Sequence, residues 1–331
     1  MSETTLGQVL TQEQQCQLKL ESIFMPHARK KRDEVYDKKK RFVHYTSADA
    51  ALKIVESKRL WMRSTTCMSD YREVQHGFDI LLQFFSNVEK KARFCSALDA
   101  CFPGVADEAI KMFDDYWRDT QANTYISSIS VHDDNENFHG RLSMWRAFGG
   151  NTARVALVFR IPFFAPGADK LNIIFSPVAY MEEADAHAEL EEIIKNIQDN
   201  KKFICSVDRP QIVQTVFTML YAAVVCLKHP GFLEENEWRV IYGPNRYPSP
   251  LVESSTEVVA GVPQLVYKLP LEANVSPFLA DLDMARIFDR LIIGPSPYAW
   301  AISQAFSAAL KKCGVDDADE RICISGIPIR P

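Results

Sequence analysis

The chain has 331 residues, of which 47% are hydrophobic and 24% charged, and its formal net charge is -5. These values are typical of a globular protein with a sizeable core, organised as one large domain or two modest ones. The mild negative charge excludes a wholly basic surface of the kind that binds nucleic acid through its phosphates.

Apolar spacing at periods of two and of about 3.6 residues predicts a series of strands and helices. In chain order we expect a helical lead-in to residue 40, a strand at 42–45, a helix beginning at 46–49, a strand at 60–64, helices at 74–93 and 106–118, a strand at 124–131, a short helix at 141–148, strands at 153–161 and 171–180, helices at 182–198 and 210–227, strands at 237–242, 264–269 and 288–293, a helix at 299–312 and a strand at 321–325.

The predicted organisation is a helical, basic lead-in at residues 1–40 and a single α+β domain at 41–331, with a helical insertion at about 182–230. Strands and helices interleave irregularly, which favours a mixed sheet with helices packed around it. The segment 27–41, at the end of the lead-in, is strongly basic, with a run at 27–32 followed by another at 38–41. Such a run is typical of a solvated helix face, and alternatively of a contact with a protein or nucleic acid.

The sequence also predicts where the protein is found. Residues 1–15 are polar and lack the apolar core of a signal peptide. The most apolar stretch, 213–227, is shorter than the roughly 20 residues that cross a bilayer, so we expect a buried helix and no membrane partner. None of the eight cysteines forms a Cys-x-x-Cys pair. Scattered cysteines of this kind indicate reduced thiols and a cytoplasmic protein.

The first candidate site is His44-Tyr45-Thr46, where a predicted strand meets a predicted helix. We expect Thr46 to be the N-cap of that helix, with Asp49 completing a capping box. Free amides and the positive end of a helix attract anions, while a histidine and a tyrosine can bond a ribose or stack on a base. The alternative is that His44 is a hydrogen-bonded core residue and Thr46 only a cap.

The second candidate site is Glu237-Trp238-Arg239. Alternation along a strand places Glu237 and Arg239 on one face and Trp238 on the other, which is the core face. A glutamate beside an arginine on a central strand is unusual, because carboxylates are rarely buried without a partner. The pair is therefore a candidate for chemistry, and alternatively a structural ion pair or part of an edge strand.

Two further clusters contain side chains that bind cations. Asp70 and Glu73 fit a helix N-terminus, and with His76 they could form a one-sided metal face. A second cluster consists of His132, Asp133, Asp134, Glu136 and His139. Helix capping and an exposed loop explain these residues more simply, so a metal-dependent nuclease or hydrolase is an alternative function.

Several motifs together resemble a bacterial family known only as a domain of unknown function, over about residues 41–331. They are His44-Tyr45-Thr46, Asp70-x-x-Glu73, Met144-Trp145 and Glu235-x-Glu237-Trp238-Arg239. More distantly, the opening strand with its His-x-Thr, helix and strand resembles the start of ADP-ribosyltransferases. That resemblance implies a mainly antiparallel, split sheet surrounded by helices.

The second resemblance also implies an activity: an NAD-using ADP-ribosyltransferase or NAD glycohydrolase that acts as a bacterial toxin or antiphage effector. It implies NAD as substrate, no metal, and a protein or nucleic acid as acceptor. Glu237 would be catalytic and His44 would hold the ribose. The residues expected to contact NAD are Tyr45, Thr46, Tyr71, Trp145 and Arg239. The alternative is a non-catalytic module that binds a nucleotide or a protein partner.

Overall fold

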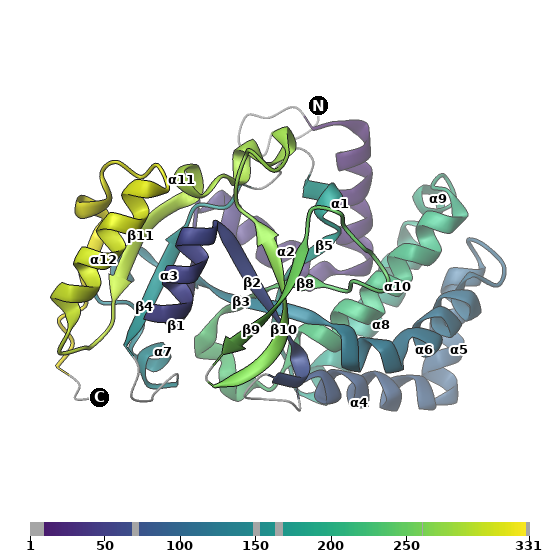
Figure 1. The fold of residues 1–331 in the computed structure, drawn as a ribbon. Helices are drawn as coiled ribbons and strands as arrows, with labels where there is room; N and C mark the ends of the chain where they lie inside the picture. The colour runs from purple at the N-terminus through teal and green to yellow at the C-terminus, as the bar shows by residue number, and fades with distance from the viewer. Residues whose placement is uncertain (1–9, 68–72, 148–152, 163–167, 260, 329–331) are drawn as a thin grey trace. The chain divides into compact units, whose positions relative to one another are not determined.

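The computed structural model describes residues 10–67, 73–147, 153–162, 168–259 and 261–328 (Figure 1). The chain forms two compact units, each built from three stretches. The helical unit comprises Met1–Lys38, Thr65–Ala122 and Ser176–Leu233, and the sheet unit comprises Lys39–Ser64, Asn123–Phe175 and Glu234–Pro331. The expected lead-in and the expected insertion belong to the same unit, together with a third stretch.

The helical unit packs its helices around α10, which is buried on nearly all sides. Its elements are α1 (Gln12–Phe24), α2 (Pro26–Asp37), α4 (Glu73–Ser86), α5 (Val88–Asp99), α6 (Val105–Asn123), α8 (Glu183–Asp199), α9 (Lys201–Ile204) and α10 (Arg209–Cys226), with a parallel strand pair of β6 (Ala179–Tyr180) and β7 (Leu227–Lys228). The predicted helix at 74–93 is two helices, because Asn87 accepts a hydrogen bond from the amide of Lys90 and starts a new one. Gly77 of α4 lies so close to α10 that a Cβ would be 2.6 Å from the carbonyl oxygen of Val224.

The basic run of the lead-in lies on α2, and several of its charges are neutralised by neighbouring carboxylates. Arg29 pairs with Asp33 at 2.7 Å and Arg32 with Glu21 of α1 at 2.9 Å. Such pairs are typical of a solvated helix face. Across the described residues, none of the helices is both long enough and apolar enough to cross a membrane.

The sheet unit contains a mixed and mostly antiparallel open sheet, as the sequence predicted. Its strands are β1 (Arg41–Ser47), β2 (Arg59–Ser64), β3 (Tyr125–His132), β4 (Arg154–Phe159), β5 (Ile173–Pro177), β8 (Glu237–Tyr242), β9 (Glu253–Val259), β10 (Val262–Pro270), β11 (Phe288–Ile293) and β12 (Ile322–Ile324). The order is β12-β11-β4-β1-β3-β2-β10-β9, and β8 pairs with both β3 and β5. The β11–β12 pair is parallel.

Helices cover both faces of this sheet (Figure 1). On one face, α3 (Ala48–Ser57) and α12 (Ala299–Lys312) pack their apolar sides against strand residues such as Leu157. On the other face, α7 (Leu142–Ala147) places Met144 and Trp145 against Val43 and Tyr45. We call these the α3 face and the α7 face. Neighbouring residues of a strand alternate between them.

The sheet is split beside β3. Strand β1 pairs with residues 130–132 of β3, β2 pairs with residues 125–126, and β8 pairs with residues 125–130. Strand β8 occupies one edge of β3 over its whole paired length. Strands β1 and β2 must therefore share the other edge of β3. They leave residues 127–129 between them, and this gap is where β1 turns away toward α3.

Strand β1 is longer than predicted, which moves the cap of α3 by one residue. Pairing with β4 continues to Ser47, opposite Arg154. Ser47 is therefore the N-cap, and its hydroxyl accepts a hydrogen bond from the amide of Ala50 at 3.2 Å. The expectation that Thr46 caps this helix is wrong, because Thr46 is held in the strand opposite Val155.

Replacing the cap tests this assignment. We expect Ser47→Ala to lower the free energy of unfolding by about 1 kcal/mol, because it leaves a helix amide without its acceptor. Ser47→Asp should retain most of that stability, since aspartate is an equally good cap and favours the positive helix end. Urea denaturation of the two variants and the wild type measures both effects. Equal stability of Ser47→Ala and wild type would contradict the assignment.

Candidate functional site

A buried polar cluster lies on β3 and β8. Glu237 is 4% exposed and Arg239 is 1% exposed. The guanidinium of Arg239 donates through Nε to Glu237 Oε1 at 2.9 Å and through Nη2 to Oε2 at 3.2 Å. Ser128 of β3 donates its hydroxyl proton to Oε1 at 2.5 Å. Both carboxylate oxygens thus receive charged or short hydrogen bonds, the arrangement that a buried carboxylate needs.

The cluster has this form because the two strands alternate in register. Ser128 lies opposite Arg239, and Ser130 lies opposite Glu237. Trp238, between the two charged residues, points to the opposite face and packs edge-on against Phe42 at 5.2 Å between ring centroids. The predicted division of this strand into a polar face and a core face is what the structure shows.

His44 lies at the split in the sheet. Its Nδ1 is 2.8 Å from the carbonyl oxygen of Ser128, on the part of β3 that neither β1 nor β2 pairs with. Burial lowers the pKa of His44, although the bond to Ser128 opposes this shift. A neutral imidazole that faces a carbonyl must carry its proton on Nδ1, so Nε2 is left as a hydrogen-bond acceptor.

The expected His44-Tyr45-Thr46 site is divided between the two faces. Val43 pairs with Ser130, which pairs with Glu237, so Val43 and the alternate residue Tyr45 share the α7 face with Glu237. His44 and Thr46 alternate onto the α3 face. His44 and Glu237 are consequently joined through Ser128 and do not line one open cleft.

The aromatic candidates are placed differently from one another. Trp145 is 7% exposed, packs edge-on against Tyr45 at 4.9 Å between centroids, and donates its indole N–H to the carbonyl oxygen of His139 at 2.7 Å. The hydroxyl of Tyr45 accepts from the amide of Arg141, and burial raises the pKa of Tyr45 to about 12. Tyr71 and Asp70 lie outside the described residues.

Arg141 joins the segments that surround this cluster, and the sequence did not single it out. It forms two hydrogen bonds with the carboxylate of Glu136, at 2.7 and 3.1 Å. Its other donors reach the carbonyl oxygens of Val131, Glu234 and Glu235 at 2.8–2.9 Å. One side chain therefore ties the end of β3 to the segment that leads into β8. No sequence motif predicts this role of Arg141, because most of the atoms that accept its hydrogen bonds are backbone carbonyl oxygens.

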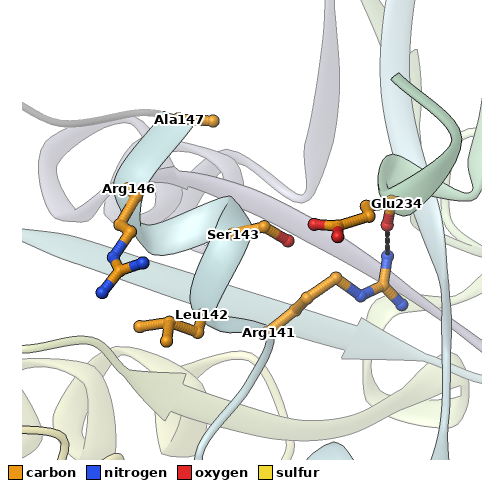
Figure 2. A pocket seen from close by; sticks show the side chains of 6 residues that line it. All are labelled: Arg141, Leu142, Ser143, Arg146, Ala147 and Glu234. Atoms are coloured by element: carbon orange, nitrogen blue, oxygen red, sulfur yellow. Dashed lines mark hydrogen bonds between the residues drawn. The ribbon is translucent and has the colours of Figure 1, made fainter. Parts of the chain in front are cut away.

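Arg141 also lines a surface hollow of about 640 Å³. The other residues that line it are Leu142, Ser143, Arg146, Ala147 and Glu234. Figure 2 shows Arg141 directed toward Glu234, whereas Arg146 points away from both. Arg146 is exposed, and among the described residues no carboxylate forms an ion pair with it. One of the residues that line the hollow, Glu234, precedes Glu237 at the start of β8 by three positions.

The predicted cation cluster at 132–139 is occupied by ion pairs. Asp133 pairs with Lys40, Asp134 with Arg41 at 2.7 Å, and Glu136 with Arg141. His132 is fully buried and bonds Asn137 at 3.0 Å, and His139 bonds the carbonyl oxygen of Ser325. In the part of the chain that the structure describes, no three His, Cys, Asp or Glu residues are grouped as a metal site.

A double-mutant cycle measures how strongly Glu237 and Arg239 depend on each other. We expect Arg239→Met to lower the free energy of unfolding by about 3–5 kcal/mol, because it removes the two charged hydrogen bonds that Arg239 donates to the buried carboxylate of Glu237. Adding Glu237→Leu should recover much of that loss, since an apolar pair needs no compensation. Urea denaturation supplies the energies. Losses that simply add in the double variant would contradict the coupling.

A family model matches part of the chain. Residues 144–240 match the family described as "Protein of unknown function (DUF2971)". The match begins in α7 at Met144 and ends inside β8, so it contains Trp145 together with Glu237 and Arg239. No curated protein and no solved structure matches the chain. The match confirms, over residues 144–240, the predicted resemblance to a family of unknown function.

Proposed function

We propose that the protein is an NAD-using ADP-ribosyltransferase or NAD glycohydrolase in which Glu237 is the catalytic carboxylate. The observation that carries the proposal is the buried carboxylate of Glu237, which Arg239 and the hydroxyl of Ser128 hold in one orientation. Carboxylates held in this way are expensive to bury and are found where chemistry requires a fixed negative charge. An ADP-ribosyltransferase-like arrangement of the split sheet is part of the same proposal.

The chemistry needs such a group. When the nicotinamide–ribose bond breaks, positive charge develops on the ribose, and a carboxylate that bonds a ribose hydroxyl stabilises that charge. Fixed donors keep Glu237 oriented, so little reorganisation is needed during the reaction. His44 is then a positioning residue, because it holds the backbone carbonyl of Ser128, whose hydroxyl in turn orients Glu237. This differs from the ribose contact that the resemblance implies for His44.

The hollow over α7 supplies a place for the phosphates of NAD. Arg146 is an exposed cation with no ion pair among the described residues, and a guanidinium binds phosphate through two donors. Tyr45 and Trp145 lie on the same face of the sheet as Glu237, and in this proposal they are the aromatic candidates for the nicotinamide. Because Glu237 is only 4% exposed, substrate must displace part of the cover over the carboxylate before it reacts.

Nicotinamide release from NAD tests the assignment of Glu237. We expect wild-type protein to release nicotinamide and Glu237→Gln to lower kcat at least about a hundredfold, as for the loss of a fixed electrostatic group. The matched control is Glu253→Gln, an exposed glutamate of β9 in the same unit, which should leave the rate unchanged. Equal rates in wild type and Glu237→Gln would overturn the assignment.

A second variant guards against misfolding of Glu237→Gln. Ser128→Ala removes only the hydroxyl that orients the carboxylate, and we expect it to lower kcat while the melting temperature still rises on adding NAD. If NAD stabilises the wild type and no nicotinamide appears, the protein is the non-catalytic nucleotide-binding module instead. If neither NAD nor ADP-ribose stabilises it, both readings fail. Activity that survives EDTA would remove the metal-dependent alternative.

The proposed phosphate contact of Arg146 in the hollow can be tested separately, through the KM for NAD. Arg146→Gln is expected to raise the KM for NAD about tenfold with little change in kcat, because a phosphate contact made equally in ground and transition states affects only binding. Arg286→Gln, an exposed arginine on α11 (Met284–Ile287), is the control. Steady-state kinetics of both variants measure this. A fall in kcat with unchanged KM would contradict a purely binding role.

A further inference from the structure

Two cysteines that are far apart in the sequence meet in the helical unit. Cys101 lies just after α5, and Cys205 is the C-terminal cap of α9. The Sγ atom of Cys205 lies 3.6 Å from the carbonyl oxygen of Cys101, across a sequence separation of 104 residues. The thiol of Cys101 itself donates to the carbonyl oxygen of Ala97 at 3.7 Å.

The two thiols differ in what surrounds them. Cys205 is exposed to solvent, whereas Cys101 is partly covered. Burial, followed by the neighbouring Cys205 thiol, raises the pKa of Cys101 to about 11, and the cation of Lys201 opposes this shift. A thiol reacts as its thiolate. Cys205 is therefore the one that an external reagent meets first, and Cys101 is placed to react with it afterwards.

We propose that Cys101 and Cys205 form a reversible disulfide when the protein meets a low-molecular-weight disulfide such as oxidised glutathione. A disulfide requires about 2 Å between the sulfur atoms and about 5.5 Å between the Cα atoms. Sγ of Cys205 already lies 3.6 Å from the carbonyl oxygen of Cys101, and both cysteines lie in turns at helix ends. A movement of these turns, with rotation of the Cys101 side chain away from Ala97, would bring the two sulfurs into bonding distance.

The exchange takes two balanced steps. The thiolate of Cys205 attacks one sulfur of the reagent, its S–S bond breaks, and one reduced thiol leaves with the proton that Cys205 gave up. The thiolate of Cys101 then attacks Sγ of Cys205 and releases the second reduced thiol. Two electrons pass from the cysteine sulfurs to the reagent sulfurs. The new bond joins the turn after α5 to the end of α9.

The bond should also raise the free energy of unfolding of the helical unit. It closes a loop of about a hundred residues, and closing a loop of that length restricts the unfolded chain strongly. We therefore expect the oxidised protein to melt at a higher temperature than the reduced protein, and a thiol reductant to reverse the shift. The proposed NAD chemistry is independent of this, because its residues are all in the sheet unit.

The test treats the full-length, reduced protein with oxidised glutathione and maps the products by peptide mass spectrometry. Wild-type protein should lose two hydrogen atoms and yield a cross-linked peptide pair containing Cys101 and Cys205. Cys101→Ser should stop at the mixed disulfide and carry one glutathione on Cys205, and Cys205→Ser should give no cross-link. The matched control is Cys95→Ser, because Cys95 lies on α5, the helix that precedes Cys101. This variant should behave as wild type.

Two results would overturn the proposal. One is wild-type protein that accumulates glutathione on Cys205 without forming the internal cross-link. The other is a cross-link that persists in Cys205→Ser or disappears in Cys95→Ser, because a different pair of cysteines would then be responsible. Folding of each variant is checked by its melting temperature in the reduced state, where serine in place of an exposed Cys205 is expected to have little effect.

Discussion

The buried ion pair of Glu237 and Arg239 is the constraint on which the rest of the sheet unit depends. Two charges removed from water must satisfy each other and their remaining hydrogen-bonding atoms, or the cost is several kcal/mol. The pair also fixes register. A slip of β8 by one residue on β3 would turn both charges onto the core face and Trp238 off it. Trp238 packs there against Phe42 and Phe175, so core packing and charge pairing demand the same register.

The split in the sheet follows from the other edge of β3. Strands β1 and β2 pair with different parts of that edge, and Ser128 lies in the gap between them. The imidazole of His44 bonds the carbonyl oxygen of Ser128 there, in place of a strand. The same serine bonds Glu237 through its side chain. A neutral histidine in the gap and a charged pair behind it are thus parts of one hydrogen-bonded chain across three strands. Arg141 holds the end of that chain by tying β3 to the segment before β8.

Much of this could be predicted from local patterns. The bounds of β8, β11 and α12 agree with the sequence prediction because each has a clear period and a clear stop, such as Gly294-Pro295 after β11. The polar face of β8 was likewise predictable from alternation. Strand β9 was missed, since its residues are mostly polar or exposed and the hairpin with β10 defines it.

The remaining differences come from tertiary pairing. The cap moved from Thr46 to Ser47 because β4 extends β1, and that pairing is invisible in a local window. Alternation along β1 places Tyr45 on the opposite face of the sheet from His44 and Thr46, although the three are adjacent in sequence. The carboxylates at 133–136 look like cation ligands until the distant Lys40, Arg41 and Arg141 are brought to them.

The most direct measurement is a crystal structure of the protein with a non-hydrolysable NAD analogue. We expect the ribose next to nicotinamide to lie within hydrogen-bonding distance of the Glu237 carboxylate, with Ser128 and Arg239 still bonded to that carboxylate and the phosphates near Arg146. An analogue bound elsewhere, or bound in the hollow with Glu237 still sealed from its ribose, would contradict the claim that this carboxylate is catalytic.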